Sequence, residues 1–169
     1  MKLIPLTQGK FAMVDDEDFE YINQFKWCAV KDGNTYYATR HIRLIINNRR
    51  QIEMRMHRDV MGCKYKDGKQ VDHEDRDGLN CQRYNLRFST HSQNMANRQP
   101  KKNGTSKYLG LSFDKRKKSW EVKIQHNKKS IRLGYFKNEA DGAKAYNEKA
   151  KELHGKFASL NVINDTSSK

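Results

Sequence analysis

VDHEDRDGLNCQRYNLRFSTHSQN, residues 71–94, is the stretch that decides the fold of this chain. Adjacent Asp72 and His73 are followed by Asn85, twelve residues after the histidine, and by Asn94, nine residues later. Read locally, KQVDHED predicts a strand ending in a sharp turn, RDGLNCQRY a loop, NLRFST a second strand and HSQNMANR the start of a helix. This order predicts that Asp72 and His73 converge with Asn94.

The four residues suit the hydrolysis of a phosphodiester, which needs an activated water and neutralisation of the phosphate charge. His73 can act as the base near neutral pH. The carboxylate of Asp72 and the amide oxygen of Asn94 offer the hard oxygen ligands that Mg²⁺ prefers. Each residue alone is equally an ordinary turn, cap or helix residue, and His91 is a rival to Asn94. The four together favour the catalytic interpretation.

Residues 57–98, which contain HRDVMG and the stretch above, resemble the HNH endonucleases with the ββα-metal motif, particularly phage and intron homing endonucleases. The resemblance implies that His73 is the general base and that Asn85 orders the loop that positions it. It also implies that Asp72 and Asn94 bind one divalent metal ion, Mg²⁺ or Mn²⁺, with no other small-molecule cofactor. The third motif position is Asn94 rather than histidine, a variant that also occurs in the homing branch.

Charge indicates the partner of the chain. The 169 residues hold 34 Lys and Arg against 20 Asp and Glu, a net charge of +14, which favours a polyanion such as nucleic acid. No run of eighteen apolar residues is present, and the opening lacks the pattern of a signal peptide, so a cytoplasmic protein with no membrane partner is expected, in the bacterial host if phage-encoded. Cys28, Cys63 and Cys81 show no CxxC spacing and predict reduced thiols rather than a zinc site.

The charge is uneven along the chain, with 17 basic and 13 acidic residues in 1–100 but 17 and 7 in 101–169. We expect a β-rich N-terminal region plus nuclease domain over 1–98, a linker over 99–106, a second domain over 107–161 and a tail over 162–169. In the first, the KDGN turn at 31–34 predicts a hairpin. Trp27, Tyr36 and Tyr37 are interpreted as core or cross-strand residues, and His57 as a packed or surface histidine.

The second domain is expected to hold three short strands, YLGLSF, SWEVKIQ and SIRLGYF, and a helix capped by Asn138 and ended by Gly155. Residues 107–161 resemble the plant APETALA or ethylene-response-factor DNA-binding domain through YLGL, the Trp120 strand, LGYF and AYNEKA. The resemblance implies that the sheet enters the major groove of DNA. The candidate DNA contacts are Leu109, Ser112, Arg116, Lys118, Lys123, Gln125, Ser130 and Arg132, with Arg98 before the linker.

The sequence thus predicts an α+β chain, a ββα-metal nuclease domain with a β-rich extension followed by a three-stranded antiparallel sheet packed on one helix. Its expected activity is site-specific hydrolysis of double-stranded DNA, carried out by a monomer, with a dimer left open. A non-catalytic DNA-binding regulator that retains a relic nuclease fold is the alternative. An RNA-binding or structural basic protein is a third interpretation.

Overall fold

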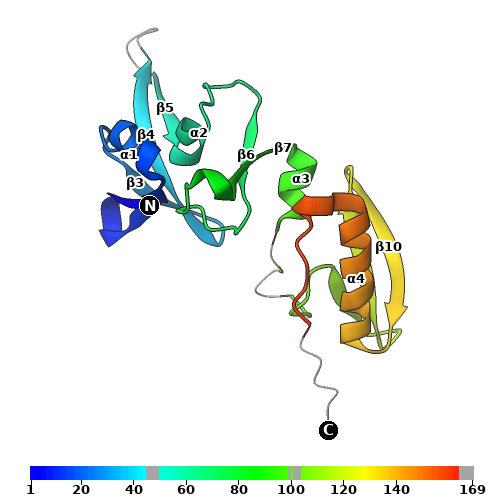
Figure 1. Ribbon diagram of the computed structural model, residues 1–169. Helices are drawn as coiled ribbons and strands as arrows, with labels where there is room; N and C mark the ends of the chain where they lie inside the picture. Colours follow the sequence, from blue (N-terminus) through cyan, green and yellow to red (C-terminus); the bar gives the residue numbers. More distant parts are fainter. Residues whose placement is uncertain (45–49, 99, 101–103, 164–169) are drawn as a thin grey trace. The chain divides into compact units, whose positions relative to one another are not determined.

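The chain folds into two compact units, Met1–Thr90 and His91–Lys169, in a computed structural model that describes residues 1–44, 50–98, 100 and 104–163 (Figure 1). The protein is a mixed α+β structure with several small antiparallel sheets. In the expected linker, residues 99 and 101–103 lie outside the described residues, as do residues 164–169 of the expected tail. No helix in the described part of the chain is long and apolar enough to span a membrane.

Three antiparallel pairings build the first unit. Strand β1 (Lys2–Pro5) pairs with β2 (Phe11–Val14) across the 3₁₀ turn η1 (Thr7–Gly9), and β6 (Gln70–His73) pairs with β7 (Leu86–Ser89). Strands β3 (Cys28–Asp32), β4 (Thr35–Leu44) and β5 (Arg50–Arg55) form a sheet in that order. The hairpin expected at 31–34 is confirmed, because β3 and β4 meet there and Gly33 has the positive φ of +60° that such a turn requires.

Short helices close this unit around one core. Helix α1 (Asp16–Ile22) begins with three acidic residues, which favourably face the positive end of the helix dipole. The indole Nε1 of Trp27 donates to the carbonyl of Ile22 at 2.9 Å, so Trp27 is a core anchor as expected. Helix α2 (Met56–Val60) follows β5, and the 3₁₀ turn η2 (Arg83–Asn85) precedes β7. The core combines residues from the first strands with Met56, Val71 and Leu86, so the N-terminal region and the β6–β7 pair share one interior.

The second unit is a three-stranded sheet covered by one helix, as predicted. Strands β8 (Leu111–Asp114), β9 (Ser119–His126) and β10 (Lys129–Phe136) pair in the order β10-β9-β8, and α4 (Glu139–His154) packs on them (Figure 1). Helix α3 (His91–Ala96) packs on β9 and on the 3₁₀ turn η3 (Gly155–Phe157). The second compact unit therefore starts at His91, ahead of the boundary expected after residue 98.

Small residues let α4 lie close on the sheet. Ala143 and Ala150 are fully buried, and a Cβ added to Gly142 would sit 3.0 Å from the side chain of Val122. The expected cap at the start of the helix is confirmed, since Asn138 Oδ1 accepts from the amide of Ala140 at 2.8 Å. The expected end at Gly155 is also confirmed by its φ of +50°.

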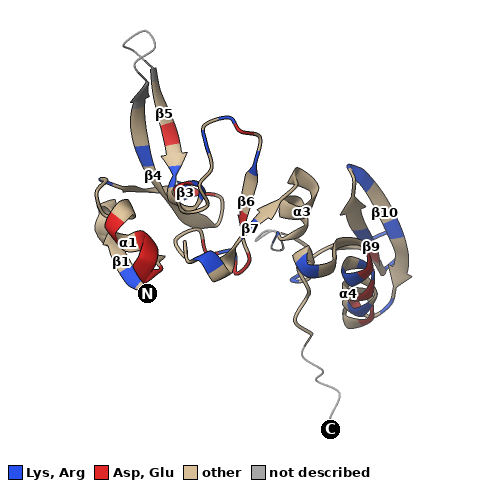
Figure 2. Ribbon diagram, turned by 45° about the horizontal axis from the view of Figure 1, so that its top comes forward, with Lys and Arg blue, Asp and Glu red and all other residues tan. Residues whose placement is uncertain are grey.

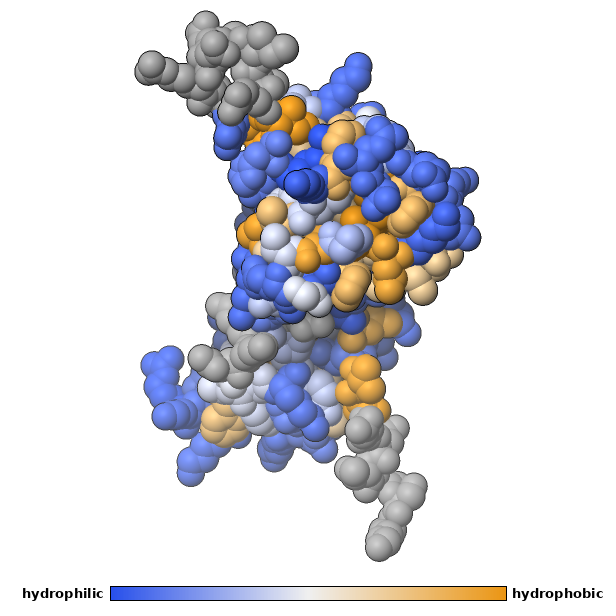
Figure 3. All heavy atoms as spheres, turned by 90° about the vertical axis from the view of Figure 1, so that its left-hand side faces the viewer, coloured by the Kyte–Doolittle hydropathy of each residue, from blue (hydrophilic) through white to orange (hydrophobic). Residues whose placement is uncertain are grey.

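Charged residues are distributed differently on β10 and on α4. Lys and Arg residues recur along β10, while acidic and basic residues alternate on α4 (Figure 2). In Figure 3, apolar side chains reach the surface in small groups between hydrophilic ones. Leu3 and Phe11, on β1 and β2, are exposed apolar residues of the first unit.

Candidate functional site

Asp72 and His73 are the last two residues of β6, and both side chains are buried. In the β6–β7 ladder Asp72 lies opposite Arg87 and His73 opposite Leu86. Arg87 donates from Nε and Nη2 to Oδ2 of Asp72 at 3.0 and 2.9 Å. The acid is thereby held in one orientation by a charge-assisted contact that sequence reasoning did not anticipate.

Three rings gather in the same part of the first unit. The imidazole centroids of His57, on α2, and His73 lie 4.7 Å apart with the rings nearly perpendicular. The ring of Tyr37, on β4, lies 5.7 Å from each of them, and the guanidinium of Arg55 lies 4.5 Å from its centroid. His57 is packed, as the sequence indicated, but it packs against the candidate base. The HRDVMG segment was the signal that placed it within the nuclease resemblance.

Burial controls the protonation of both histidines. It lowers the pKa of His73 to about 4, with the charges of Asp75 and Asp77 opposing this shift and that of Arg55 adding to it. Burial also holds the pKa of His57 well below its ordinary value, with a further contribution from His73. Both imidazoles are therefore neutral at pH 7, which is the form that can accept a proton.

Asn85 fixes the loop that follows His73. Its Oδ1 accepts from the amide of Asp75 at 3.0 Å, and its Nδ2 donates to Oδ1 of Asp75 and to the carbonyl of Asn80, both at 2.9 Å. Its own carbonyl accepts from the amide of Glu74 at 2.9 Å. The side chain is buried, so these bonds form away from water. Asn85 thus ties both ends of the loop together immediately after His73.

Residues 13–18 also form hydrogen bonds to this loop. The backbone of Met13 bonds to Leu79 and Cys81 at 2.8 Å each. The carboxylate of Asp15 accepts from the amide of Arg83 at 2.7 Å, and Asp18 binds the guanidinium of Arg83 at 2.6 and 2.8 Å. Residues of β2 and of the start of α1 therefore hold the loop of the candidate site directly.

Gly78 brings this loop close to strand β4. A Cβ at this position would lie 2.5 Å from the carbonyl oxygen of Tyr36 and 2.7 Å from the ring of Tyr37. The amide of Gly78 donates to Thr35 Oγ1 at 3.0 Å. Only glycine leaves room for this packing, which links the loop to the ring cluster of Tyr37, His57 and His73.

Asn94, the second expected metal ligand, is exposed on α3, the first element of the second unit. Within the described residues no three His, Cys, Asp or Glu side chains gather as a metal cluster. The expected donor set is smaller: one carboxylate, on Asp72, and one amide, on Asn94. It suits Mg²⁺, which commonly keeps several waters and takes only one or two carboxylates along with substrate phosphate oxygens.

The sheet of the second unit has two chemically different faces. Leu111, Val122 and Ile124 are buried in its core, against α4. Because side chains alternate along a strand, the neighbours of these residues lie on the open face. Ladder pairing joins Lys123 to Arg132 across β9 and β10. The predicted contacts that are exposed on these strands are Ser112, Lys123, Gln125, Ser130 and Arg132.

Leu109 lies elsewhere than the sequence suggested. It is only 5% exposed and belongs to the core of the second unit, with its amide donating to Asn161 Oδ1 at 2.6 Å. The chain turns at Gly110, whose φ is +85° and where an added Cβ would collide with the ring of Tyr146. β8 therefore starts at Leu111. Leu109 stabilises the unit and is not on its open face.

The basic turn between β8 and β9 is held by Asp114. Its Oδ1 accepts from the amides of Arg116 and Lys117 at 2.9 and 3.1 Å, an arrangement typical of an Asx turn. Lys117 places its Nζ 3.6 Å from the ring centroid of Tyr135. Arg116 and Lys118 are exposed on this turn. Trp120 is half-buried and packs edge-on against Phe113 at 5.0 Å, as expected for a core anchor.

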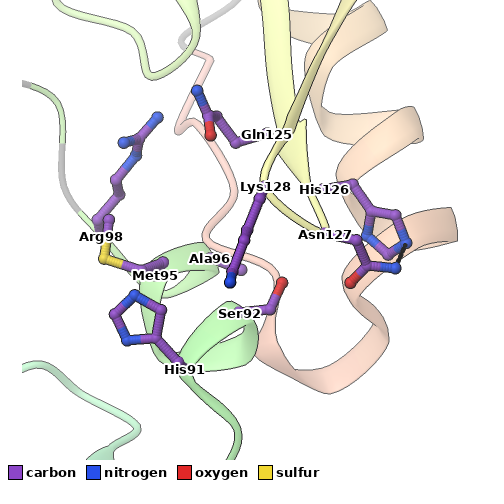
Figure 4. Close-up of a pocket in the computed structure, with 9 residues that line it drawn as sticks. All are labelled: His91, Ser92, Met95, Ala96, Arg98, Gln125, His126, Asn127 and Lys128. Carbon is purple, nitrogen blue, oxygen red and sulfur yellow. Dashed lines mark hydrogen bonds between the residues drawn. The ribbon is translucent and has the colours of Figure 1, made fainter.

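A cavity of about 360 Å³ opens beside α3 within the second unit (Figure 4). Met95 and Ala96 contribute apolar side chains to its lining. His91, Arg98 and Lys128 contribute polar or cationic groups. Gln125 also lines it. Two of the predicted DNA contacts, Arg98 and Gln125, thus share one hollow.

Comparison with known proteins gives one match. Residues 62–96 match the family model of an HNH endonuclease. No curated protein and no solved structure matches the chain. The matched segment includes β6, the loop tied by Asn85, β7 and α3. The match supports a nuclease of the HNH type, with DNA as the substrate that this family implies.

Proposed function

We propose that this protein is a site-specific, metal-dependent DNA endonuclease of the homing type. The observation that carries the proposal is the buried Asp72 and His73 pair on β6, followed by a loop tied down by Asn85, inside the segment that matches the HNH endonuclease model. Burying polar groups costs free energy that hydrogen bonds and ion pairs must offset. A role in phosphodiester hydrolysis is the reason we propose for burying this pair.

In this proposal His73 accepts the proton of the attacking water. Its packing against His57 and Tyr37 limits the ring to few orientations, and Asn85 fixes the chain that follows it. Asp72 and Asn94 would hold one Mg²⁺ or Mn²⁺ ion, and that ion would supply the positive charge that offsets the charge of the scissile phosphate. Arg87, bonded to Oδ2 of Asp72, fixes the orientation of this carboxylate.

In this proposal the second unit recognises the target sequence in the DNA. The +10 charge of residues 101–169, 17 basic against 7 acidic, attracts the phosphate backbone. Its open sheet face presents Lys123, Gln125 and Arg132, whose donors match base edges in the major groove. This division gives the recognition of DNA to one unit and the hydrolysis to Asp72, His73 and Asn94.

One contact favours the second candidate, a DNA-binding regulator without nuclease activity. The ion pair with Arg87 already neutralises the charge of Asp72, the acid that is expected to bind the metal ion. If the pair never opens a ligand position to a cation, the chain binds DNA but leaves it intact. Cleavage and binding must therefore be measured separately.

The test uses purified full-length protein with supercoiled plasmid that carries DNA from the native locus, in Mg²⁺ and in EDTA. We expect Mg²⁺-dependent conversion to the nicked form, since one site per chain cuts one strand per encounter. His73→Ala should lose at least about 100-fold in rate while binding the same DNA. His41→Ala, which removes an exposed histidine of the same unit, is the matched control and should cut normally. Intact plasmid that is nevertheless bound specifically would replace the endonuclease with the regulator.

A further inference from the structure

Glu121 lies at the centre of the open face of the sheet in the second unit. It lies on the middle strand β9, opposite Ser112 on β8 and Tyr135 on β10. Its Oε2 lies 2.8 Å from Nζ of Lys123, and its Oε1 lies 2.7 Å from Nε of Arg132. The hydroxyl of Tyr135 donates to Oε1 at 3.2 Å. The side chain of Glu121 is only 13% exposed, whereas those of Lys123 and Arg132 are 44% and 57% exposed.

An acid in this place works against simple attraction to DNA. A carboxylate repels the phosphate backbone, and two cations that neutralise it contribute less to binding any sequence. Hydrogen bonding from Lys123 keeps the pKa of Glu121 below its ordinary value, so the charge is present at neutral pH. The presence of the acid needs a reason other than affinity.

The contact with Arg132 supplies that reason. Glu121 takes the Nε–H of the guanidinium, and the two terminal nitrogens keep the parallel N–H pair that matches O6 and N7 of guanine. A free arginine side chain loses considerable rotamer freedom when it binds. An arginine already held by a carboxylate loses less, and its fixed orientation keeps it from adjusting to an incorrect base.

We propose that Glu121 is a positioning residue that fixes Arg132 for an end-on, bidentate contact with a guanine in the major groove. This rests on the proposed function, in which the sheet binds duplex DNA. The surface is then a guanine reader rather than a general phosphate clamp. Lys123, held on the other carboxylate oxygen, is kept out of the path of Arg132.

The experiment selects bound duplexes from a randomised library with full-length protein in EDTA, which prevents metal-dependent cutting. Glu121→Gln keeps the shape of the side chain and removes its charge. Glu148→Gln, at an exposed position on α4, makes the same change in net charge away from the sheet and is the matched control. Arg132→Ala identifies which base position depends on the guanidinium, because alanine offers no donor to a base edge.

We expect the wild type to select guanine at one position that Arg132→Ala no longer specifies. Glu121→Gln should lower the preference for guanine there by about fivefold or more, the lower end of what a bidentate contact discriminates. Glu148→Gln should leave it unchanged, and both glutamine variants should bind unselected DNA slightly more tightly. Glu121→Asp keeps the charge but withdraws the carboxylate, so it should also lower the guanine preference and separates positioning from charge.

Three results overturn the inference in distinguishable ways. A Glu121→Gln protein that melts normally and keeps the wild-type guanine preference shows that Arg132 needs no support. A wild type that binds duplex DNA without any base preference removes the guanine reader but keeps DNA binding. A wild type that binds no duplex removes the proposed DNA-binding function of the second unit together with the inference.

Discussion

Replacing Asn85 with alanine should destabilise the first unit selectively. The side chain is 2% exposed and makes three hydrogen bonds within the loop, to the amide and carboxylate of Asp75 and to the carbonyl of Asn80. Their loss leaves a backbone amide and a carbonyl without these partners, and each buried polar group left in this state costs about 1–3 kcal/mol. We therefore expect a loss of about 3 kcal/mol in the free energy of unfolding.

Urea unfolding followed by tryptophan fluorescence measures this loss. In a Trp120→Phe background the remaining indole is Trp27, which is buried in the core of the first unit and reports on that unit alone. With a slope of roughly 2 kcal/mol per M, the midpoint should fall by about 1.5 M. Asn23→Ala, at an exposed position after α1, is the control and should shift the midpoint little.

Asn85→Asp sharpens the same test. It keeps an oxygen that can accept from the amide of Asp75 but puts an acceptor against the carboxylate of Asp75 and the carbonyl of Asn80. It should be at least as destabilising as alanine at pH 7, and less so where the acids are protonated. A shift of less than about 0.5 M for Asn85→Ala would refute the argument that this network secures the loop.

Two further changes test the packing around His73. Its folded-state pKa of about 4 lies below the ordinary 6.5, so the unfolded chain binds more protons between these values. Stability should be complete above about pH 6.5 and decline by about 3 kcal/mol as the pH falls to 4, with His57 acting in the same direction; urea midpoints that do not change over this range would contradict the burial of neutral imidazoles. Gly78→Ala should cost about 1–3 kcal/mol by thermal unfolding, because the new Cβ meets the backbone of Tyr36. Gly33→Asn, with nothing within 4 Å and a residue that tolerates positive φ, should cost less than half as much, and equal losses would show that the contact at Gly78 is easily relieved.

Local patterns predicted the elements whose signals are contained in neighbouring residues. The hairpin at 31–34, the strands around Trp120 and the capped helix that begins after Asn138 each follow from turn chemistry or periodicity. The role of Asn85 in ordering its loop was expected from the nuclease resemblance, and its hydrogen bonds are consistent with it.

Features that depend on distant residues were not predictable in this way. Helix α2 is only five residues long, too short for a periodic signal, yet it brings His57 onto His73. The burial of Leu109 follows from the turn at Gly110 against Tyr146, which lies far along the chain. Glu121 carries no signal of its own in the sequence, because nothing near it shows that Arg132 will lie beside it.

The hydrogen bonds between the N-terminal residues and the loop determine when the loop can fold during synthesis. Met13 bonds to Leu79 and Cys81, and Asp15 bonds to Arg83, so these contacts join residues nearly seventy positions apart. Contacts of such long sequence separation form slowly and require the intervening chain to be present. A ribosome-bound chain therefore carries its first hairpin without its partner until residues beyond 83 have emerged. The loop that follows His73 should therefore reach its final structure late in translation, after most of the first unit has left the ribosome.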